Sequence, residues 1–353
     1  MSEKVLMKGN EALCEGAIIA GCRFYFGYPI TPQNEIPAYM ARRLPEVGGC
    51  FLQAESELGS INMVWGAAVS GKRALTSSSS PGISLMQEGI SYLAGAELPA
   101  VVVDMVRGGP GLGSIGPAQS DYFQATRGGG HGDYRVIVLA PSTVQELANI
   151  MIDAFDLADI YRTPVIVLGD GVIGQMTEPL ILPKPSTQKI SKKDWILDGA
   201  NGRESRIIMS LRLTPQGALE EHNLHLQKKY EEIAGKEVQF EEYELTDAEL
   251  VIVAFGTASR VAKACILEAR ERGMRVGLLR PITLWPFPMR ELEKLSKQKR
   301  VKAFLDVEMN LGQMIEDVRL AVCGNKEVFF YGRTGGMVLD QDELLEKIVE
   351  VYA

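Results

Sequence analysis

The stretch PAVVVDMV, residues 99–106, is a nearly continuous apolar run. Such runs are typical of strands that a parallel sheet buries on both faces. The segment before it, residues 83–95, has the apolar spacing of a helix, and the same alternation of strand and helix extends through residue 171. This alternation predicts an α/β domain with a parallel sheet and helices on both faces. Further strands are expected at 24–30, 50–55, 73–79, 135–141 and 163–171, and further helices at 10–21 (capped by Asn10), 33–44, 57–71 and 142–159.

The alternation is interrupted once. Residues 178–245 begin with a segment rich in Pro, Lys and Ser and continue with a mostly charged stretch. We interpret them as an interdomain arm with some helix. Strands and helices alternate again after this arm. The sequence therefore predicts an α/β domain over residues 1–177, the arm over residues 178–245, and a second α/β domain over residues 246–353.

Composition and charge narrow the class of protein. The 353 residues are 46% hydrophobic and 23% charged, which is typical of a globular chain, and the net charge of −8 argues against nucleic acid as a partner. No apolar run is long enough to cross a membrane, and the N-terminal residues are too charged for a signal peptide. We therefore expect a cytoplasmic protein without a membrane partner.

The cysteines show no C-x-x-C spacing. Their number is odd, and we expect them to be reduced and mostly buried. This chain alone is therefore expected to ligate neither zinc nor an iron–sulfur cluster, and no metal site is assigned to it. The five cysteines are Cys14, Cys22, Cys50, Cys265 and Cys323.

Polar residues follow three of the predicted strands. The segment FYFGYPITPQNE, residues 24–35, ends a strand in a corner with two prolines around Thr31. Glu55 and Glu57 follow the next strand, and the run Ser77–Ser80 follows the third. The carboxyl ends of parallel strands share one edge of a sheet, which is where open α/β sheets bind ligands. A ligand site is therefore expected at this edge, although an acid at a helix start is also common without one.

Three other motifs are weaker. Residues 111–116 match G-x-G-x-x-G, but prolines on both sides predict an extended loop and not the helix that a dinucleotide site needs. The G-D-G at residues 169–171 lacks the following Asn pair of a magnesium–diphosphate site, so a strand-end turn is favoured. His222 and His225 lie in the charged arm, where a solvated helix face is the simpler interpretation. His131 is left as the one histidine for acid–base chemistry.

Several motifs, in order along the chain, resemble the α-type chain of 2-oxoacid:ferredoxin oxidoreductases, most closely the branched-chain (3-methyl-2-oxobutanoate) type. The resemblance implies a pyrimidine-binding domain for thiamine diphosphate, followed by a transketolase-C-like α/β domain. The motifs are YPITP (28–32), ESELGSINMVWGAA (55–68), TSSSSPGISLMQEGISYLAGAELP (76–99), RGGPGLGSIGPAQSDYFQATRGGGHGDYR (107–135) and FGTASRVAKACILEARERGMRVGLLRPITLWPFP (255–288).

The same resemblance assigns roles to individual residues. Glu57, in the S-E-x-G context of the family's glutamate, is expected to bind the pyrimidine ring nitrogen and so to activate the cofactor. Thr31 is expected to face the substrate, and Arg107 is the nearest match to the arginine that binds the substrate carboxylate. The resemblance places Pro29, Glu57, Ser78 and Ser79 in the cofactor site.

The resemblance also implies partners. Magnesium and [4Fe–4S] clusters are expected on other chains: a diphosphate-binding chain, a gamma-type chain and a ferredoxin-like chain. The expected reaction oxidises 3-methyl-2-oxobutanoate with coenzyme A to acyl-CoA and carbon dioxide and passes electrons to ferredoxin. A 2-oxoglutarate enzyme is the alternative, with Arg127 or Arg135 as a second cation for the distal carboxylate. A nicotinamide dehydrogenase and a non-catalytic scaffold of the complex are the rival functions.

Overall fold

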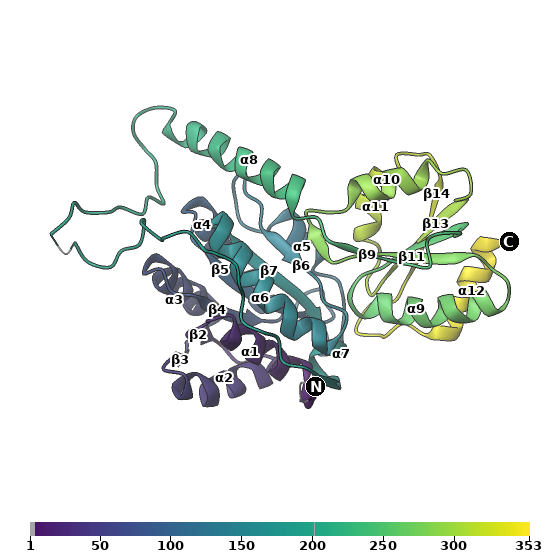
Figure 1. Ribbon diagram of the computed structural model, residues 1–353, viewed down its shortest axis with the longest axis horizontal. Coiled ribbons are helices and arrows are strands. Elements are labelled where there is room, and N and C mark those ends of the chain that lie inside the picture. The colour runs from purple at the N-terminus through teal and green to yellow at the C-terminus, as the bar shows by residue number, and fades with distance from the viewer. Residues whose placement is uncertain (1–3, 201) are drawn as a thin grey trace.

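The computed structural model describes residues 4–200 and 202–353, and its first domain is built on a seven-stranded sheet of order β12-β6-β7-β5-β4-β2-β3 (Figure 1). All neighbouring strands are parallel except β12, which is antiparallel to β6. The predicted α/β class is therefore confirmed. Its strands are β2 Phe24–Gly27, β3 Cys50–Gln53, β4 Ala74–Ser78, β5 Ala100–Val106, β6 Ile137–Leu139, β7 Pro164–Asp170 and β12 Thr283–Trp285.

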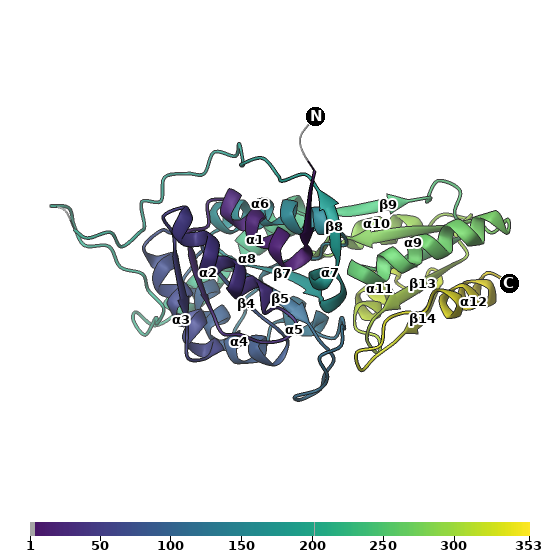
Figure 2. The same cartoon turned by 90° about the horizontal axis from the view of Figure 1, so that it is seen from below.

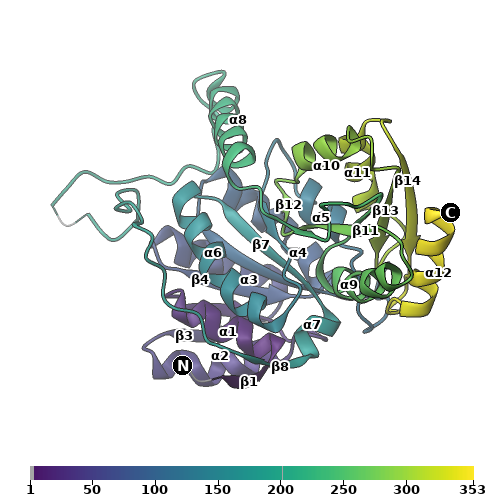
Figure 3. The same ribbon diagram turned by 45° about the vertical axis from the view of Figure 1, so that its right-hand side comes forward.

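Helices cover both faces of this sheet, as Figure 3 shows. Every residue of β5 is buried, because its successive side chains enter opposite cores. Val102 and Val106 pack with helices α3 and α4, whereas Val101 and Val103 pack with α1, α2 and α6. The helices are α1 Gly9–Ile19, α2 Glu35–Glu46, α3 Glu57–Val69, α4 Pro81–Gly95, α5 Tyr122–Arg127, α6 Val144–Tyr161 and α7 Gly171–Gln175.

The second domain is a smaller α/β layer structure. Its five-stranded sheet has the order β14-β13-β10-β11-β9, and only β9 is antiparallel to its neighbour. Its strands are β9 Phe240–Tyr243, β10 Leu250–Val253, β11 Val276–Pro281, β13 Ala303–Glu308 and β14 Glu327–Gly332. Its helices are α9 Gly256–Glu271, α10 Met289–Ser296, α11 Met314–Val322 and α12 Gln341–Tyr352.

Strand pairing crosses the predicted domain boundaries. β9 lies within the range predicted as an arm but joins the second sheet, and β12 comes from the second domain but joins the first sheet. A further strand of the predicted arm, β8 (Thr177–Leu180), pairs with β1 (Val5–Lys8) near the N-terminus (Figure 2). The division into three parts remains a prediction, and the sheets show that its parts are interlocked.

A buried arginine strengthens the junction of the two domains. Arg280 of β11 is only 2% exposed. Its guanidinium donates to Glu146 of α6 (2.8 Å) and to Glu241 of β9 (2.7 Å). Because a buried cation needs such partners, these bonds fix the second domain against the start of α6.

The arm itself is extended. The described residues 181–200 and 202–217 form neither helix nor strand, and helix α8 (Ala218–Lys236) then returns along the first domain (Figure 1). Although α8 is rich in charge, Leu226, Tyr230 and Ile233 form one buried stripe that joins the hydrophobic cluster on this side of the first sheet, where Tyr230 contacts Trp285 of β12. Among the described residues, no helix is long and apolar enough to cross a membrane.

One predicted cap is wrong. Helix α1 begins at Gly9, so Asn10 lies inside it and is completely buried. The Asn10 amide donates to the backbone oxygen of Pro32 (3.1 Å) and to Glu35 (3.0 Å). Asn10 therefore stabilises the proline corner after β2, a long-range contact that local capping preferences do not reveal.

Candidate active site

Glu57 is a buried carboxylic acid at the start of a helix. It is the first residue of α3, and Ser56 before it caps the helix by accepting a hydrogen bond from the Gly59 amide (3.2 Å). The Glu57 side chain is 6% exposed and accepts a hydrogen bond from the Ser78 hydroxyl (3.2 Å). Glu55, the other candidate acid, is exposed. Burial therefore distinguishes the two acids: Glu57, which the resemblance selects, is the buried one.

Gly82 gives the Glu57 carboxyl its space. A Cβ atom at position 82 would lie 2.0 Å from the Ser78 hydroxyl oxygen and 2.5 Å from Oε1 of Glu57. Both distances are far shorter than van der Waals contact, so a larger residue would displace one or both side chains. Glu57, Ser78 and Gly82 thus form one closely packed unit from three segments.

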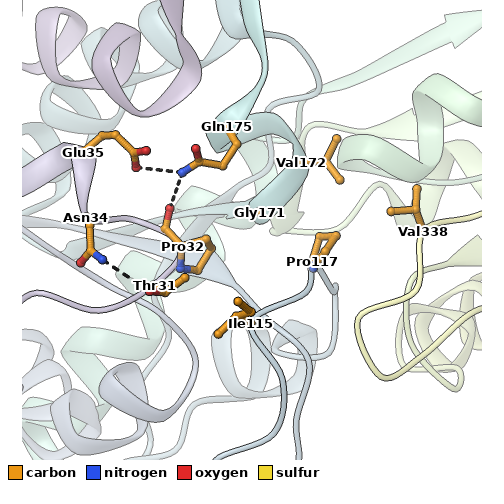
Figure 4. A pocket seen from close by; sticks show the side chains of 10 residues that line it. All are labelled: Thr31, Pro32, Asn34, Glu35, Ile115, Pro117, Gly171, Val172, Gln175 and Val338. Atoms are coloured by element: carbon orange, nitrogen blue, oxygen red, sulfur yellow. Dashed lines mark hydrogen bonds between the residues drawn. The ribbon is translucent and has the colours of Figure 1, made fainter.

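The corner after β2 lines a cavity of about 560 Å³. Figure 4 shows Thr31 and Pro32 on one side of this cavity, Val338 of the second domain on the other, Pro117 between them and Ile115 below. Helices α2 and α7 complete the walls, and Gln175 of α7 donates to the Pro32 oxygen (2.9 Å). The Thr31 hydroxyl has a long contact of 3.4 Å with the Asn34 amide, and Pro29 is exposed just before the corner.

Arg107 lies directly beside the corner. It is 7% exposed, and its guanidinium donates to the backbone oxygens of Thr31 (3.0 Å) and Leu112 (3.2 Å). Its Nε atom is buried and has no hydrogen-bond partner among the described residues. The structure therefore brings Thr31 and Arg107 together, and it leaves the Nε–H of the guanidinium unused by the described part of the chain.

The four consecutive serines have separate environments. Ser77 donates to Gln33 (2.6 Å) and accepts from Tyr25 (2.8 Å), and burial raises the pKa of the Tyr25 phenol. Ser78 donates to Glu57, and the Ser79 hydroxyl is buried without a partner among the described residues. Of the run expected to face a ligand, Ser79 thus has a hydroxyl that the described part of the protein leaves unused, and Ser78 contacts the candidate cofactor acid.

The glycine-rich motif, the G-D-G and the histidine pair do not form the ligand sites that their sequences suggest. Residues 111–116 form exposed turns, and no helix begins there. Asp170 of the G-D-G is 2% exposed, caps α7 through the Val172 amide (3.0 Å) and accepts from the Thr257 hydroxyl (2.9 Å). His222 and His225 contact the end of α4, and the described residues contain no group of three or more potential metal ligands.

The comparison with known proteins defines the class. A family model described as "Pyruvate flavodoxin/ferredoxin oxidoreductase, thiamine diP-binding" matches residues 15–243. A second model, pyruvate:ferredoxin oxidoreductase core domain II, matches residues 248–344. Together with the fold and the buried acid, these matches define a thiamine diphosphate-binding α/β protein. The chain belongs to the pyruvate flavodoxin/ferredoxin oxidoreductase family.

Relatives place the chain within this family more narrowly. The ketoisovalerate oxidoreductase subunit VorB of Methanothermobacter marburgensis is 50% identical over 98% of this chain and 97% of its own length. The 2-oxoglutarate synthase subunit KorA of Methanocaldococcus jannaschii is 40% identical over 97% of this chain and 98% of its own. These relatives confirm the expected resemblance to subunits of 2-oxoacid:ferredoxin oxidoreductases.

A solved structure shows the same fold over the whole chain. The 2-oxoglutarate:ferredoxin oxidoreductase from Magnetococcus marinus, determined with 2-oxoglutarate, coenzyme A and succinyl-CoA bound, matches with a TM-score of 0.88 and 28% identity. The match covers all of this chain and 66% of that chain. The predicted combination of a thiamine diphosphate-binding domain and a second α/β domain is therefore confirmed.

Two acids near the site were not predicted from the sequence. Asp104 is 1% exposed within β5, and Asp121 lies beside it at the start of α5. The signal that could have indicated Asp104 is a single charge inside the otherwise apolar run 99–106, because a buried strand tolerates a carboxylate only where partners exist. No such signal marks Asp121 or Gly82, whose contacts are made across the fold.

Proposed function

We propose that this chain is the pyrimidine-binding subunit of a thiamine diphosphate-dependent oxidoreductase. In this proposal the complex converts 3-methyl-2-oxobutanoate and coenzyme A to acyl-CoA, carbon dioxide and reduced ferredoxin. The observation that carries the proposal is the buried Glu57 carboxyl, which Ser78 orients and Gly82 leaves room for. A buried acid without a cationic partner among the described residues is costly unless a ligand completes its interactions.

The residues present fit the pyrimidine half of the cofactor. Glu57 would hold a proton at the ring nitrogen, and the unpartnered hydroxyl of Ser79 is available for a further hydrogen bond. Pro29, exposed at the rim, would contact the ring. When bound, thiamine diphosphate supplies an electron sink for the carbon that loses carbon dioxide.

The substrate groups are assigned to the proline corner. Arg107 would pair with the 2-oxoacid carboxylate through the guanidinium, whose Nε has no partner within the chain. The Thr31 hydroxyl, held only by a long contact, would donate to a substrate oxygen. The guanidinium of Arg107 bonds the backbone oxygen of Thr31, so each of the two residues helps to hold the other in place. Both groups are therefore oriented before the substrate binds, which lowers the cost of reaching a reactive geometry.

The diphosphate, magnesium and iron–sulfur clusters are assigned to partner chains. Large apolar side chains are exposed next to the site residues: Leu58 (45% exposed) follows Glu57, Leu85 (55%) lies in α4, and Leu112 (84%) lies in the loop after Arg107. Exposed apolar side chains that surround polar site residues are typical of a protein interface. This arrangement supports a cofactor site shared with the diphosphate-binding chain.

The proposed substrate is a branched-chain 2-oxoacid. Ile115, Val172 and Val338, among the ten described residues that line the cavity at Thr31, are aliphatic. Apart from Arg107 beside the corner, these described residues offer no second cation for a distal carboxylate. Arg127 and Arg135, the candidates for a second carboxylate, line a different cavity, and Arg127 is paired with Asp317 (3.1 Å). These contacts favour an apolar substrate, and the KorA relatives keep 2-oxoglutarate as the alternative.

The kcat/KM values of the purified complex for the candidate substrates decide between these assignments. We expect kcat/KM for 3-methyl-2-oxobutanoate to exceed that for 2-oxoglutarate and for pyruvate by at least about tenfold. Pyruvate lacks the branched methyl groups, and a methyl-sized difference in an apolar pocket is worth about 10–200-fold. 2-Oxoglutarate would bring a second carboxylate into an apolar lining, which is costly without a cationic partner. Ferredoxin reduction in the presence of coenzyme A is the measurement. A preference for 2-oxoglutarate would reject the branched-chain assignment and leave the family unchanged.

Replacing Thr31 by alanine should affect turnover far more than stability. Within the described part of the chain the hydroxyl makes only one long contact, so its loss costs little folding free energy. If it binds the substrate, kcat/KM should fall by about tenfold or more. Comparing kinetics with thermal unfolding of the variant complex tests this, with Thr126→Ala, which removes a hydroxyl bonded only to the Tyr122 backbone, as the control. Lower stability with unchanged kinetics would mean that Thr31 has a structural role only and does not bind the substrate.

A further inference from the structure

Ser80 connects two segments of the site through a strained turn. Its φ angle is +30°, which is unusual for a residue with a side chain and requires support from its surroundings. The Ser80 amide donates to Asp104 (3.1 Å), and the Ser80 hydroxyl donates to Asp121 (2.5 Å). The amide of Arg107 in turn donates to the Ser80 hydroxyl (3.0 Å). Ser80 thus stands between a pair of acids and the backbone of the substrate-binding arginine.

The two acids act as one unit. Both accept hydrogen bonds from Ser80: Asp104 from its amide and Asp121 from its hydroxyl. Burial raises the pKa of both acids, and the charge of Asp121 raises that of Asp104 further. Ser80 therefore joins the two carboxyl groups through its backbone and its side chain.

Asp121 determines the direction of the Ser80 hydroxyl. A serine hydroxyl has a single hydrogen, and two acceptors are within reach: Asp121 at 2.5 Å and the backbone oxygen of Arg107 at 3.2 Å. Donation to Asp121 leaves the oxygen lone pairs free to accept the Arg107 amide. Without Asp121 the hydrogen would turn toward the Arg107 oxygen, and only the bond of the Ser80 amide to Asp104 would still tie the strained turn to the acids.

The second domain holds Asp121 in place. Gln313 donates to the backbone oxygen of Ser120 (2.7 Å) and accepts from the Phe123 amide (2.8 Å), so it brackets Asp121 on both sides. The Tyr122 hydroxyl donates to Asp317 of α11 (2.5 Å). These bonds make the loop that carries Asp121 a rigid element of the domain junction, which suits a positioning role.

We propose that Asp121, together with Asp104, positions Arg107 for the carboxylate of the 2-oxoacid by fixing the hydroxyl of Ser80. This inference rests on the proposed function, because it assigns Arg107 to the substrate carboxylate. Asp121 itself touches neither substrate nor cofactor and is a positioning residue. It acts on the binding of the 2-oxoacid and not on the cofactor acid Glu57.

Steady-state kinetics of the complete complex test this proposal. The Asp121→Ala complex should show a KM for the 2-oxoacid raised about tenfold, the effect of one lost charge-assisted hydrogen bond, with kcat within about twofold. Asp121→Asn should retain a KM near that of the wild type, because its side-chain oxygen can still accept the hydrogen bond of Ser80. A partly unfolded preparation would instead lower kcat and leave KM unchanged.

Ser80→Gly keeps the proposal testable if Asp121→Ala fails to assemble. Glycine tolerates the positive φ angle, so this variant removes the hydroxyl without backbone strain. It should raise KM about as much as Asp121→Ala does, and the double variant should be no worse than either single variant. Additive effects, or a defect of Asp121→Asn equal to that of Asp121→Ala, would overturn the proposal.

Two controls separate this inference from the proposed function. Asp156→Ala removes another buried acid, which is bonded to Arg73 (2.7 Å) and Ser186, and it should lower stability without changing KM. Arg107→Ala should raise KM at least as much as Asp121→Ala. If Arg107→Ala raises KM and both Asp121→Ala and Ser80→Gly do not, the positioning role alone is wrong. If Arg107→Ala leaves KM unchanged, the proposed assignment of the substrate carboxylate fails as well.

Discussion

We expect the Glu57→Gln complex to assemble normally and to decarboxylate its 2-oxoacid at least about 100-fold more slowly than the wild type. General acid–base groups typically contribute about 10²- to 10⁴-fold to a rate, and the amide of glutamine cannot exchange a proton with the cofactor ring. Glutamine has nearly the shape of glutamate and can still accept the hydrogen bond of Ser78, so the packing around Gly82 should survive. Release of carbon dioxide by the purified complex is the measurement.

Glu55→Gln is the matched control for this variant. The two acids are separated by one residue, and the control makes the same chemical change at an exposed position. Its turnover and assembly should both equal those of the wild type. Unchanged turnover of the Glu57→Gln complex would favour the rival hypothesis that this chain is a non-catalytic scaffold of the complex.

Most of the fold was predictable because its signals are local. The apolar run 99–106 and its neighbours have the length and spacing of buried strands and helices, and the structure confirms the parallel sheet that they predict. The pairing of β9 and β12 was not predictable, because a short strand does not show in its own sequence which sheet it will join. The same limit explains why the role of Asn10 was not predicted, because its partners Pro32 and Glu35 are distant in sequence.

The site was predictable in part for a similar reason. Parallel strands place their carboxyl ends on one edge, so the sequence alone is enough to assign Thr31 and Glu57 to one region of the fold. The resemblance, and not the spacing, distinguished Glu57 from Glu55, and burial agrees with that choice. The contacts of Gly82 and of Asp121 depend on side chains from other segments, and the sequence contains no sign of them.

Gly82→Ala should weaken binding of thiamine diphosphate to the complex by at least about tenfold. The new methyl group would lie 2.0 Å from the Ser78 hydroxyl and 2.5 Å from Oε1 of Glu57, so the carboxyl must move away from its place. Overpacking of this kind costs about 1–3 kcal/mol, and about 1.4 kcal/mol corresponds to a tenfold change in affinity. Titration of the cofactor-free complex by calorimetry measures the effect. Gly66→Ala in α3 is the control, because a Cβ atom there has no neighbour within 4 Å.

A second substitution shows which contact causes the loss. In the Ser78→Ala/Gly82→Ala double variant the 2.0 Å contact with the hydroxyl is gone, but the 2.5 Å contact with Glu57 remains. If displacement of Glu57 is the cause, the double variant should bind the cofactor as weakly as Gly82→Ala does. Full recovery of affinity would mean that a displaced Ser78 is the cause, and wild-type affinity in Gly82→Ala itself would mean that the carboxyl can move without loss. The pair of variants therefore tests whether the position of the Glu57 carboxyl, and not only its chemical identity, is required for the cofactor site.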